Sequence, residues 1–365
     1  MVSPFLFDRI TIIGLGLIGS SIALAVRQNK LAETIVGCDN SEIALAYARS
    51  HNMIDVAMHD LKTAVRDSDL VIISTPPSAM EDVAQQIASD LKEGALVMDT
   101  ASVKLPIMNA LSRHLPSHVD FVPAHPVAGS EKSGSNAGKK NLFDNRRVVV
   151  TPNEPLQDNM LQTVTSFWSK MGARVDGIPP DIHDRLYAYV SHLPHLLAFA
   201  AKKVIAIDGG DKKQQKFLRI SSSNPAMWAE IFHLNRDNVT TALDRYLDAL
   251  CHIEGELSQA PAEEKSETTS NLVHTTLFPR LASSCLITTA MEAEKNDGFS
   301  YARYAGTGFA DFISPVISQP EPEIEQISQH YLPMLELLKN YITELKKLRE
   351  LVAGNDTEAL ATALK

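Results

Sequence analysis

Two predicted loops in the first half of the chain, each past the carboxyl end of a strand, carry side chains suited to proton transfer and hydrogen bonding. One segment spans residues 99–104 and contains Ser102, and the other spans residues 123–131 and contains His125 between two prolines. Because a histidine titrates near neutral pH, His125 could accept or hold the proton of a substrate hydroxyl. Ser102 could hydrogen-bond the other imidazole nitrogen. The alternative is that His125 merely caps a loop.

A third polar cluster lies on a predicted helix that begins near Asp181. Its members follow one another at intervals of four, three and four residues, which predicts that they share one helix face; they are Asp184, Ala188, Ser191 and His195. Pro194 removes a backbone hydrogen bond inside this helix and predicts a kink. A structural and a functional role for His192 are equally compatible with the sequence.

A glycine-rich string, Gly14-Leu15-Gly16-Leu17-Ile18-Gly19, follows a predicted strand and precedes a predicted helix. Gly14 permits a tight turn, Gly16 leaves room for a pyrophosphate, and Gly19 allows the helix to pack closely on the strand. The helix that starts at Leu17 and Ile18 would direct its free amides at the phosphates. The string therefore predicts a dinucleotide site, with a glycine turn in an unrelated α/β protein as the alternative.

Asp39 ends the second predicted strand, 20 residues after Gly19. A carboxylate at this position accepts hydrogen bonds from the adenosine ribose and repels a 2′-phosphate. Since Asn40 follows it and no arginine is adjacent, NAD is favoured over NADP. Ser74, Thr75 and Pro76 end another predicted strand, where they either line the cofactor crevice or only stop the strand.

The elements that would position these residues alternate between strands and helices. Apolar, β-branched runs predict strands at residues 9–14, 34–39, 70–75, 95–99, 121–124 and 147–151. A further short run at 173–175 would end the sheet. Helical periodicity dominates after Asp181. The prediction is an α/β Rossmann-type doubly wound parallel sheet followed by an all-α helical domain.

The length of 365 residues is enough for two domains, and the net charge is −10. This balance argues against a nucleic-acid or anionic-membrane partner. No apolar run is long enough for a membrane span. Cys38, Cys251 and Cys285 show no metal-ligand spacing, so we expect no metal and a reducing, cytoplasmic location.

Taken in order, the motifs resemble those of the prephenate/arogenate (cyclohexadienyl) dehydrogenase family. They are the glycine string, Ser102-Val103-Lys104, His125-Pro-Val-Ala-Gly-Ser-Glu131, Ser191-His-Leu-Pro-His195 and Asn224-Pro-Ala-Met-Trp228. The resemblance covers about residues 7–250. It implies a Rossmann domain, a helical dimerisation domain and an active site between them. The implied activity is NAD-dependent oxidative decarboxylation of prephenate to 4-hydroxyphenylpyruvate, or of arogenate to tyrosine, in tyrosine biosynthesis.

The resemblance also implies roles for individual residues. His125 would be the catalytic histidine at the ring hydroxyl, and Ser102 would orient it or the nicotinamide. Arg219 would bind a substrate carboxylate through two hydrogen bonds. The remaining implied substrate-site residues are Glu131, Asp184, Ser191 and His195. Asp184 would tune access through charge pairing, and Trp228 is interpreted mainly as a packing residue.

The chain departs from the family after residue 214. Lys216 stands where the family has an aspartate, and the missing pattern returns near the end of the chain as Gly308-Phe-Ala-Asp311, with Ser314 at the arginine position. One copy keeps Arg219 and the other keeps Asp311. This split predicts a second, catalytically empty helical module that packs on the first and brings Asp311 to the active site, or else chance similarity between helical sequences.

The predicted organisation is a Rossmann domain at 1–178, a helical domain at 179–257, a linker at 258–271 and a second helical module at 272–365 that repeats 181–250. The chain would then be a homodimer or an internally pseudo-dimeric monomer. Two other functions compete with the favoured one. They are a dehydrogenase of the same architecture that acts on a β-hydroxy acid, and a non-catalytic NAD-sensing module.

Overall fold

The computed structural model describes residues 5–129, 134–152, 158–206, 209, 211–259, 270–318 and 330–365. The chain forms two compact units, Met1–Asp184 and Arg185–Lys365. The boundary lies a few residues after the predicted one at residue 178. No helix among the described residues is long and apolar enough to cross a membrane.

The first unit is built on a six-stranded parallel sheet with the strand order β3-β2-β1-β4-β5-β6. Its strands are β1 (Phe7–Ile13), β2 (Ala32–Cys38), β3 (Val56–Met58), β4 (Leu70–Ile73), β5 (Leu96–Asp99) and β6 (Asp120–Phe121). Central strand residues such as Ile12 and Ile72 are fully buried, as expected for a sheet covered on both faces. The strand order is that of a Rossmann fold, which confirms the predicted fold class.

A second, three-stranded sheet contains β7 (Ala124–Val127), β8 (Arg147–Val150) and β9 (Arg174–Gly177). β7 runs antiparallel to β8, and β8 runs parallel to β9. Two predictions were therefore wrong. The run at 121–124 is not one strand but is divided between the two sheets, and the run at 173–175 belongs to the small sheet and does not end the large one. β3 was not predicted, because it is short and only half-buried.

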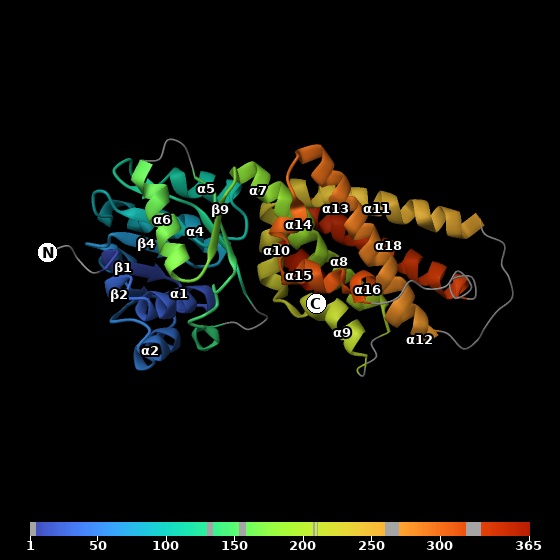
Figure 1. Ribbon diagram of the computed structural model, residues 1–365, viewed down its shortest axis with the longest axis horizontal. Coiled ribbons are helices and arrows are strands. Elements are labelled where there is room, and N and C mark those ends of the chain that lie inside the picture. The colour runs from blue at the N-terminus through green and yellow to red at the C-terminus, as the bar shows by residue number, and fades with distance from the viewer. Residues whose placement is uncertain are drawn as a thin grey trace. The chain divides into compact units, whose positions relative to one another are not determined.

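Helices and 3-10 turns connect the strands of the first unit (Figure 1). They are α1 (Leu17–Gln28), α2 (Glu42–Ser50), α3 (Leu61–Val65), α4 (Pro77–Ile87), η1 (Ala88–Asp90), α5 (Leu105–Ser112), η2 (Ser135–Ala137) and α6 (Asp158–Lys170). Phe167 and Trp168 of α6 are fully buried, and their rings pack edge to face on Phe7 and Phe143. This aromatic cluster anchors α6 to the core of the unit.

The described part of the second unit is helical, as predicted. Its elements after α7 (Pro180–Tyr187) are η3 (Ala188–His192), α8 (Leu193–Val204), α9 (Lys212–Leu218), η4 (Arg219–Ser222), α10 (Pro225–Leu234), α11 (Arg236–Gln259), α12 (Ser270–Leu272), η5 (Val273–Leu277), α13 (Phe278–Asp297), α14 (Tyr301–Tyr304), α15 (Thr307–Phe312), α16 (Ser314–Ser318), α18 (Tyr331–Ala353) and α19 (Thr357–Ala363). Most of the predicted linker, residues 260–269, lies outside the described residues.

The predicted continuous helix after Asp181 is interrupted, which corrects the expectation of one shared face. η3 is a π-helical turn, and Pro194 stands near the start of the α-helix that follows it. A π turn changes the rotation per residue, so the intervals between Asp184, Ser191 and His195 no longer define one stripe. The turn also resolves the expected proline kink, since Pro194 sits where its missing N–H costs least.

The same sequence of elements occurs twice in the second unit. The π-helical turn η5 follows η3 by 85 residues, and Phe278-Pro279 follows it as Leu193-Pro194 follows η3. The long helix α18 follows α11 by 95 residues. Each buried residue of α11 has a buried counterpart 95 positions later in α18; the counterparts are Met334, Leu337, Leu338, Tyr341, Ile342 and Leu345.

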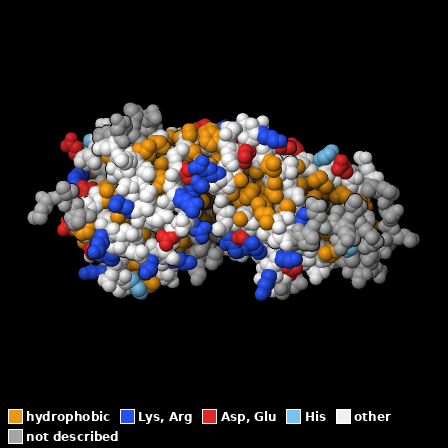
Figure 2. Space-filling model, viewed as in Figure 1, with side chains coloured by type: hydrophobic (Ala, Val, Ile, Leu, Met, Phe, Trp, Pro, Cys, Tyr) orange, Lys and Arg blue, Asp and Glu red, His pale blue; other side chains and the backbone are white. Residues whose placement is uncertain are grey.

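Apolar side chains gather on the face of the second unit that Figure 2 shows, near the positions of α13 and α14 in Figure 1. Met291 of α13 is one of the exposed large apolar residues of this unit. Tyr301 and Tyr304 of α14, by contrast, are buried in the interior of the unit. The unit thus combines an aromatic interior with a partly apolar surface.

Candidate active-site residues in the two units

The glycine turn between β1 and α1 has the geometry that a dinucleotide requires. Gly14 adopts a φ of 91°, and a Cβ at this position would lie 2.6 Å from the carbonyl oxygen of Ser74. A Cβ on Gly19 would lie 1.9 Å from the carbonyl oxygen of Gly14. Only glycine fits at these two positions. A Cβ on Gly16 would meet nothing within 4 Å, so the backbone there is open to a ligand.

The start of α1 is left without a side-chain cap. Gly16 is the N-cap residue and supplies no side-chain hydrogen bond to the amides of the first turn. Leu17 and Ile18 begin this turn, so their backbone faces the position at which a pyrophosphate would be bound. This arrangement fits the predicted cofactor role of the five residues of the turn.

Asp39 lies just beyond β2 and holds the glycine turn in place. Its Oδ2 atom accepts a hydrogen bond from the backbone N–H of Leu15 at 2.7 Å, and its Oδ1 atom accepts one from Ser41 at 2.8 Å. A carboxylate has about four lone-pair sites, so two remain for ribose hydroxyls. The predicted role at the ribose stays a prediction, and the structure adds a second role in shaping the turn.

Ser74 and Thr75 follow β4 and lie against the glycine turn. The hydroxyl of Thr100 donates to Ser74 Oγ at 3.1 Å. The hydroxyl of Thr75 is buried and has no hydrogen-bond partner among the described residues. A buried hydroxyl without a partner is costly unless a ligand pairs with it. This hydroxyl, together with the glycine cradle, shows that the residues present fit a dinucleotide; Pro76 precedes α4 as its N-cap residue.

His125 lies within β7, opposite Val149, and only 6% of its surface is exposed. The expectation that it sits in a loop is therefore wrong. Strand pairing fixes its backbone, which makes it a better-positioned group than a loop histidine would be. The prediction failed because Pro123 and Pro126 suggested irregular backbone, whereas a proline is tolerated at the edge of a short antiparallel ladder.

A chain of buried polar groups runs from His125 into the first unit. The Nδ1 atom of His125 lies 2.9 Å from Nε2 of His183, and Nδ1 of His183 lies 2.8 Å from Oδ1 of Asp184. Asp184 also accepts the backbone N–H groups of Lys104 and Leu105, at 2.7 and 2.8 Å. Asp184 therefore caps the start of α5 and anchors the two histidines at the same time.

The hydrogen-bond chain assigns the tautomers of both rings. A carboxylate only accepts, so Nδ1 of His183 carries the proton toward Asp184. Nε2 of His183 is then an acceptor, and Nδ1 of His125 donates to it. Burial, together with the charge of Lys104, holds the pKa of His183 well below its ordinary value, so this ring stays neutral. His125 consequently presents the lone pair of Nε2 as its basic atom.

Lys104 fixes the strand that carries His125. Its side chain is fully buried, forms an ion pair with Asp99, and donates to the carbonyl oxygen of Ala124 at 2.6 Å. Burial lowers the pKa of Lys104, whereas the charge of Asp99 opposes this shift. The side chain thus ties the end of β5 to β7, one residue before His125.

Of the two remaining candidates in the first unit, the structure describes Ser102 but not Glu131. Ser102 lies between β5 and α5. The Nδ1 atom of His125, for which Ser102 was a predicted hydrogen-bond partner, pairs with His183 instead. A contact between Ser102 and the nicotinamide stays a prediction. Glu131 lies outside the described residues.

In the second unit His195 is held by its own helix and by an aromatic ring. Its Nδ1 atom lies 2.8 Å from the carbonyl oxygen of Ser191, so Nδ1 donates and Nε2 is the acceptor. The ring stacks on Trp228 with centroids 3.6 Å apart. Burial lowers the pKa of His195 to about 3, and the charge of Arg219 adds to this shift. His195 is thus a neutral acceptor at pH 7.

A residue of the second helical copy, which begins at residue 272, lies beside His195. A Cβ on Gly308 would lie 3.0 Å from Cε1 of His195, so a small residue in α15 leaves room beside the ring. His192, by contrast, faces Asn235, whose Nδ2 atom is 3.0 Å from its Nδ1 atom. His192 is fully buried and packs edge to face on Trp228, which favours the structural role.

Arg219 forms an ion pair with Asp311 of the second copy through its Nε atom. The predicted approach of Asp311 to Arg219 is thereby confirmed. Arg219 is 42% exposed, and neither of its terminal nitrogens has a hydrogen-bond partner among the described residues. Asp311 thus orients the guanidinium and leaves its outer fork available for a carboxylate.

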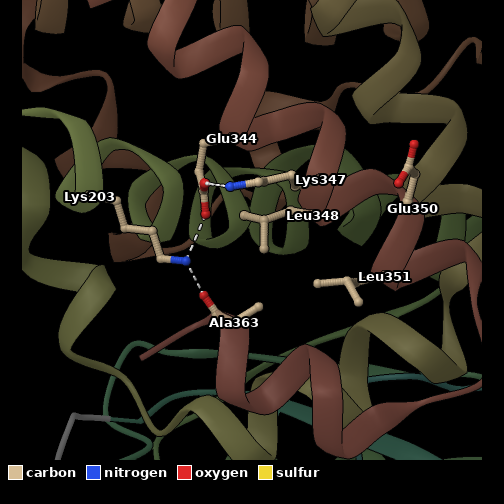
Figure 3. A pocket seen from close by; sticks show the side chains of 7 residues that line it. All are labelled: Lys203, Glu344, Lys347, Leu348, Glu350, Leu351 and Ala363. Atoms are coloured by element: carbon tan, nitrogen blue, oxygen red, sulfur yellow. Dashed lines mark hydrogen bonds and ion pairs between the residues drawn. The ribbon is translucent and has the colours of Figure 1, made fainter.

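A surface pocket of about 480 Å³ lies elsewhere in the second unit (Figure 3). Its lining residues come from α8, α18 and α19, and none of the predicted site residues is among them. Figure 3 shows Lys203 turned toward Glu344 and the backbone of Ala363, and Glu344 also pairs with Lys347. The pocket is therefore distinct from the site that the predicted residues would form.

Sequence reasoning missed His183, and it named Lys104 and Gly308 only within motifs, without a role for either. His183 stands directly before Asp184, and its burial was not evident from the polar string His-Asp-Arg. Lys104 was noted only as part of the Ser-Val-Lys motif. A buried lysine between two short strands could have been suspected from its place after Asp99.

Comparison with known families gives two kinds of match. The nucleotide-binding domain of prephenate dehydrogenase matches residues 22–176. The dimerization domain of prephenate dehydrogenase matches residues 179–275 and again residues 268–365. The second match covers the part of the chain in which the elements of the helical unit recur.

Individual relatives agree with these matches. A cyclohexadienyl dehydrogenase of Zymomonas mobilis is 33% identical over 66% of this chain and 85% of its own length. A prephenate dehydrogenase of Bacillus subtilis is 30% identical over 70% of this chain and 72% of its own. The crystal structure of an Aquifex aeolicus prephenate dehydrogenase with hydroxyphenyl propionate and NAD+ is 29% identical, with a TM-score of 0.63, over 69% of this chain and 91% of that one.

Proposed function

Because the chain belongs to the prephenate dehydrogenase family, we propose that it carries out the NAD-dependent oxidative decarboxylation of prephenate, or of its amino counterpart arogenate, in tyrosine biosynthesis. The observation that carries the proposal is the chain Asp184–His183–His125 in the unit that also holds the glycine turn. It provides a base of defined tautomer beside a dinucleotide fold.

The substrate is a cyclohexadienyl carboxylate whose hydroxyl is on the carbon that loses hydride. NAD, when bound, accepts this hydride. Nε2 of His125 takes the hydroxyl proton as the C–H bond breaks, while Nδ1–H of the same ring donates to His183. Breaking of the bond to the ring carboxylate releases carbon dioxide, and its electron pair makes the ring aromatic. The substrate oxygen then takes the proton back from His125, so no proton is lost overall.

His183 and Asp184 act through His125. When His125 becomes positively charged, the neutral His183 ring accepts its Nδ1–H, and Asp184 polarises His183 in turn. All three side chains are nearly or fully buried, so water does not compete for these hydrogen bonds. Lys104 maintains the geometry by holding the backbone at Ala124.

The second unit supplies the groups that select the substrate. The outer fork of Arg219 binds a carboxylate through two hydrogen bonds, with Asp311 holding the guanidinium from behind. Nε2 of His195 accepts a hydrogen bond from a neutral substrate donor, since this ring stays unprotonated. Ser191 contributes by fixing the His195 ring through its carbonyl oxygen.

The second match to the dimerization domain supports a further part of the proposal. Residues 272–365 form a helical module that repeats residues 181–250 and takes the place that a partner subunit's domain would occupy. One copy supplies Arg219 and the other supplies Asp311. We also expect a reducing, cytoplasmic location, since Cys38 and Cys285 are buried as free thiols.

Incubation with prephenate or arogenate and NAD, with NADH and carbon dioxide measured together, tests the function. Equal amounts of both products are expected with at least one of the two substrates. NADH without carbon dioxide from a β-hydroxy acid would replace the proposal with a different dehydrogenase activity. The kcat/KM values for the two substrates, compared side by side, decide between the keto and the amino compound.

A further inference from the structure

Hydrogen bonds between the two helical copies are reciprocal. The hydroxyl of Tyr246 in α11 donates to the carbonyl oxygen of Ala282 in α13 at 3.1 Å, and the hydroxyl of Tyr341 in α18 donates to Leu197 in α8, also at 3.1 Å. Tyr341 follows Tyr246 by 95 residues and Ala282 follows Leu197 by 85, the same intervals that separate the repeated elements. Such exchange of equivalent contacts is the mark of a two-fold interface.

Aromatic packing follows the same symmetry. Phe217 of α9 and Phe312 of α15 are equivalent at the interval of 95 residues, and their rings contact each other with centroids 4.6 Å apart. A residue that contacts its own equivalent lies on the two-fold axis. The two copies are therefore joined as two subunits of a symmetric dimer would be, but within one chain.

The ion pairs between the two long helices differ from this symmetry, because equivalent positions of the two helices carry opposite charges. Asp244 of α11 pairs with Arg349 of α18 at 2.8 Å, and Glu254 of α11 pairs with Lys339 of α18 at 3.6 Å. Asp244 and Lys339 are equivalent positions, as are Glu254 and Arg349. Each position thus holds an acid in the first copy and a base in the second.

The exchanged charges discriminate between possible partners. If two first copies met in this geometry, Asp244 of one would face Glu254 of the other, twice. If two second copies met, Lys339 would face Arg349, twice. Both arrangements place like charges opposite each other, whereas the pairing of the first copy with the second places opposite charges together at every one of these contacts.

We propose that the charges on α11 and α18 select the pairing of the two unlike copies, which the structure joins within one chain, and exclude the pairing of like copies from two chains. The face of α11 that carries Asp244 and Glu254 is thus covered by α18 of the same molecule. This inference adds to the pseudo-dimer a physical reason why each copy pairs with the unlike copy. It does not depend on the reaction catalysed.

The loss of a second site agrees with this rule. Lys216 and Ser314 are the equivalents of Asp311 and Arg219, so the reciprocal ion pair cannot form. Arg280 stands at the position of His195 and directs its guanidinium to the carbonyl oxygen of Pro315 at 3.3 Å. A copy without these groups has only an architectural use, and only in combination with the first copy.

A charge-reversal cycle tests the proposal by stability. Lys339→Glu with Arg349→Glu turns each of the two ion pairs into a pair of acids and should lower Tm by about 5 °C. Adding Asp244→Lys and Glu254→Lys restores opposite charges and should return Tm to within about 2 °C of wild type. Asp248→Lys with Lys346→Glu is the matched control, because neither residue forms an ion pair with a described residue, and both are exposed.

Two results would overturn the proposal. The first is a reversed α18 that loses no more stability than the control, or that does not recover in the fourfold variant. The second comes from Asp244→Cys with Arg349→Cys, treated with a short bis-maleimide. Pairing within a chain gives a cross-linked product of one chain's mass, 40.0 kDa, whereas a two-chain product would show pairing between chains. Each single-cysteine variant controls for reaction at Cys251.

Discussion

The Nδ1 atom of His125 lies 2.9 Å from Nε2 of His183, in the interior of the first unit. Because Asp184 fixes the opposite nitrogen of His183, this contact determines which nitrogen of His125 is basic. In a catalytic triad a carboxylate orients the catalytic histidine directly. Here Asp184 does so through a second imidazole, that of His183. His183 is therefore a positioning residue, and its removal should affect catalysis without affecting binding.

We expect His183→Phe to lower kcat by about 10²-fold and to change the pH profile, since His125 loses the acceptor for its Nδ1–H. His183→Gln offers an amide oxygen in the same region and should recover part of the activity. Steady-state kinetics across pH, with NAD affinity measured separately, check this. A purely structural role would lower the folded fraction and leave the apparent pKa of the kcat profile unchanged, which would contradict the prediction.

His125→Asn should have the larger effect on turnover. Loss of a general base costs about 10²–10⁴ in rate, whereas the glycine turn and Asp39 are untouched, so the dissociation constant for NAD should stay near the wild-type value. Stopped assays of NADH formation and a fluorescence titration with NAD give the two numbers. Activity within a few-fold of wild type would mean that another group accepts the proton.

The Rossmann core and the glycine turn could be predicted because both depend on local rules. Continuous apolar runs fix buried parallel strands, and Gly14 and Gly19 are required by backbone contacts within one βα unit. The antiparallel strand with His125 could not be predicted in this way. Its partner, β8, begins some twenty residues later, and nothing local distinguishes an edge strand with a proline from a loop.

Hydrogen bonds between polar residues far apart in the chain were also hard to predict from the sequence. The pairing of His125 with His183 joins residues 58 positions apart, and burial of a histidine next to Asp184 leaves no periodic signal. The pairing of Arg219 with Asp311 was predictable over a still longer separation, because the family pattern was divided between the two copies. Inheritance of motifs thus revealed a contact that hydrophobic periodicity could not.

Arg219→Lys should raise KM for prephenate by about 10- to 100-fold, because one ammonium replaces a fork that makes two charge-assisted hydrogen bonds. Asp311→Asn removes the charge behind the guanidinium and should raise KM less, since the fork itself remains. Initial-rate kinetics at saturating NAD measure both. An unchanged KM in Arg219→Lys would show that the substrate carboxylate is bound elsewhere.

Cofactor preference is expected to follow Asp39. Asp39→Ser with Asn40→Arg removes a repulsive carboxylate and adds a cation, so the ratio of kcat/KM with NADP to that with NAD should rise. The absolute rates should fall for both cofactors, since Leu15 and Ser41 lose their acceptor. Asp39→Asn is the matched control, because it retains one oxygen acceptor without the charge. If wild type already used NADP as well as NAD, the carboxylate would not face the ribose.

The low pKa of His195 predicts how stability depends on pH. The folded protein binds a proton at this ring only near pH 3, whereas the unfolded chain binds it near the ordinary value of 6.5. Between these values the unfolded state holds more protons, so the contribution of His195 to stability is complete above about pH 6.5 and is lost as the pH falls toward about 3. His183 shifts in the same direction and adds to the slope. Tm measured from about pH 7 to about pH 4 should therefore decline in wild type and decline less steeply in His195→Asn, which keeps a hydrogen-bonding side chain but cannot titrate in this range. Parallel curves for the two proteins would show that His195 is protonated as readily in the folded state as in the unfolded one.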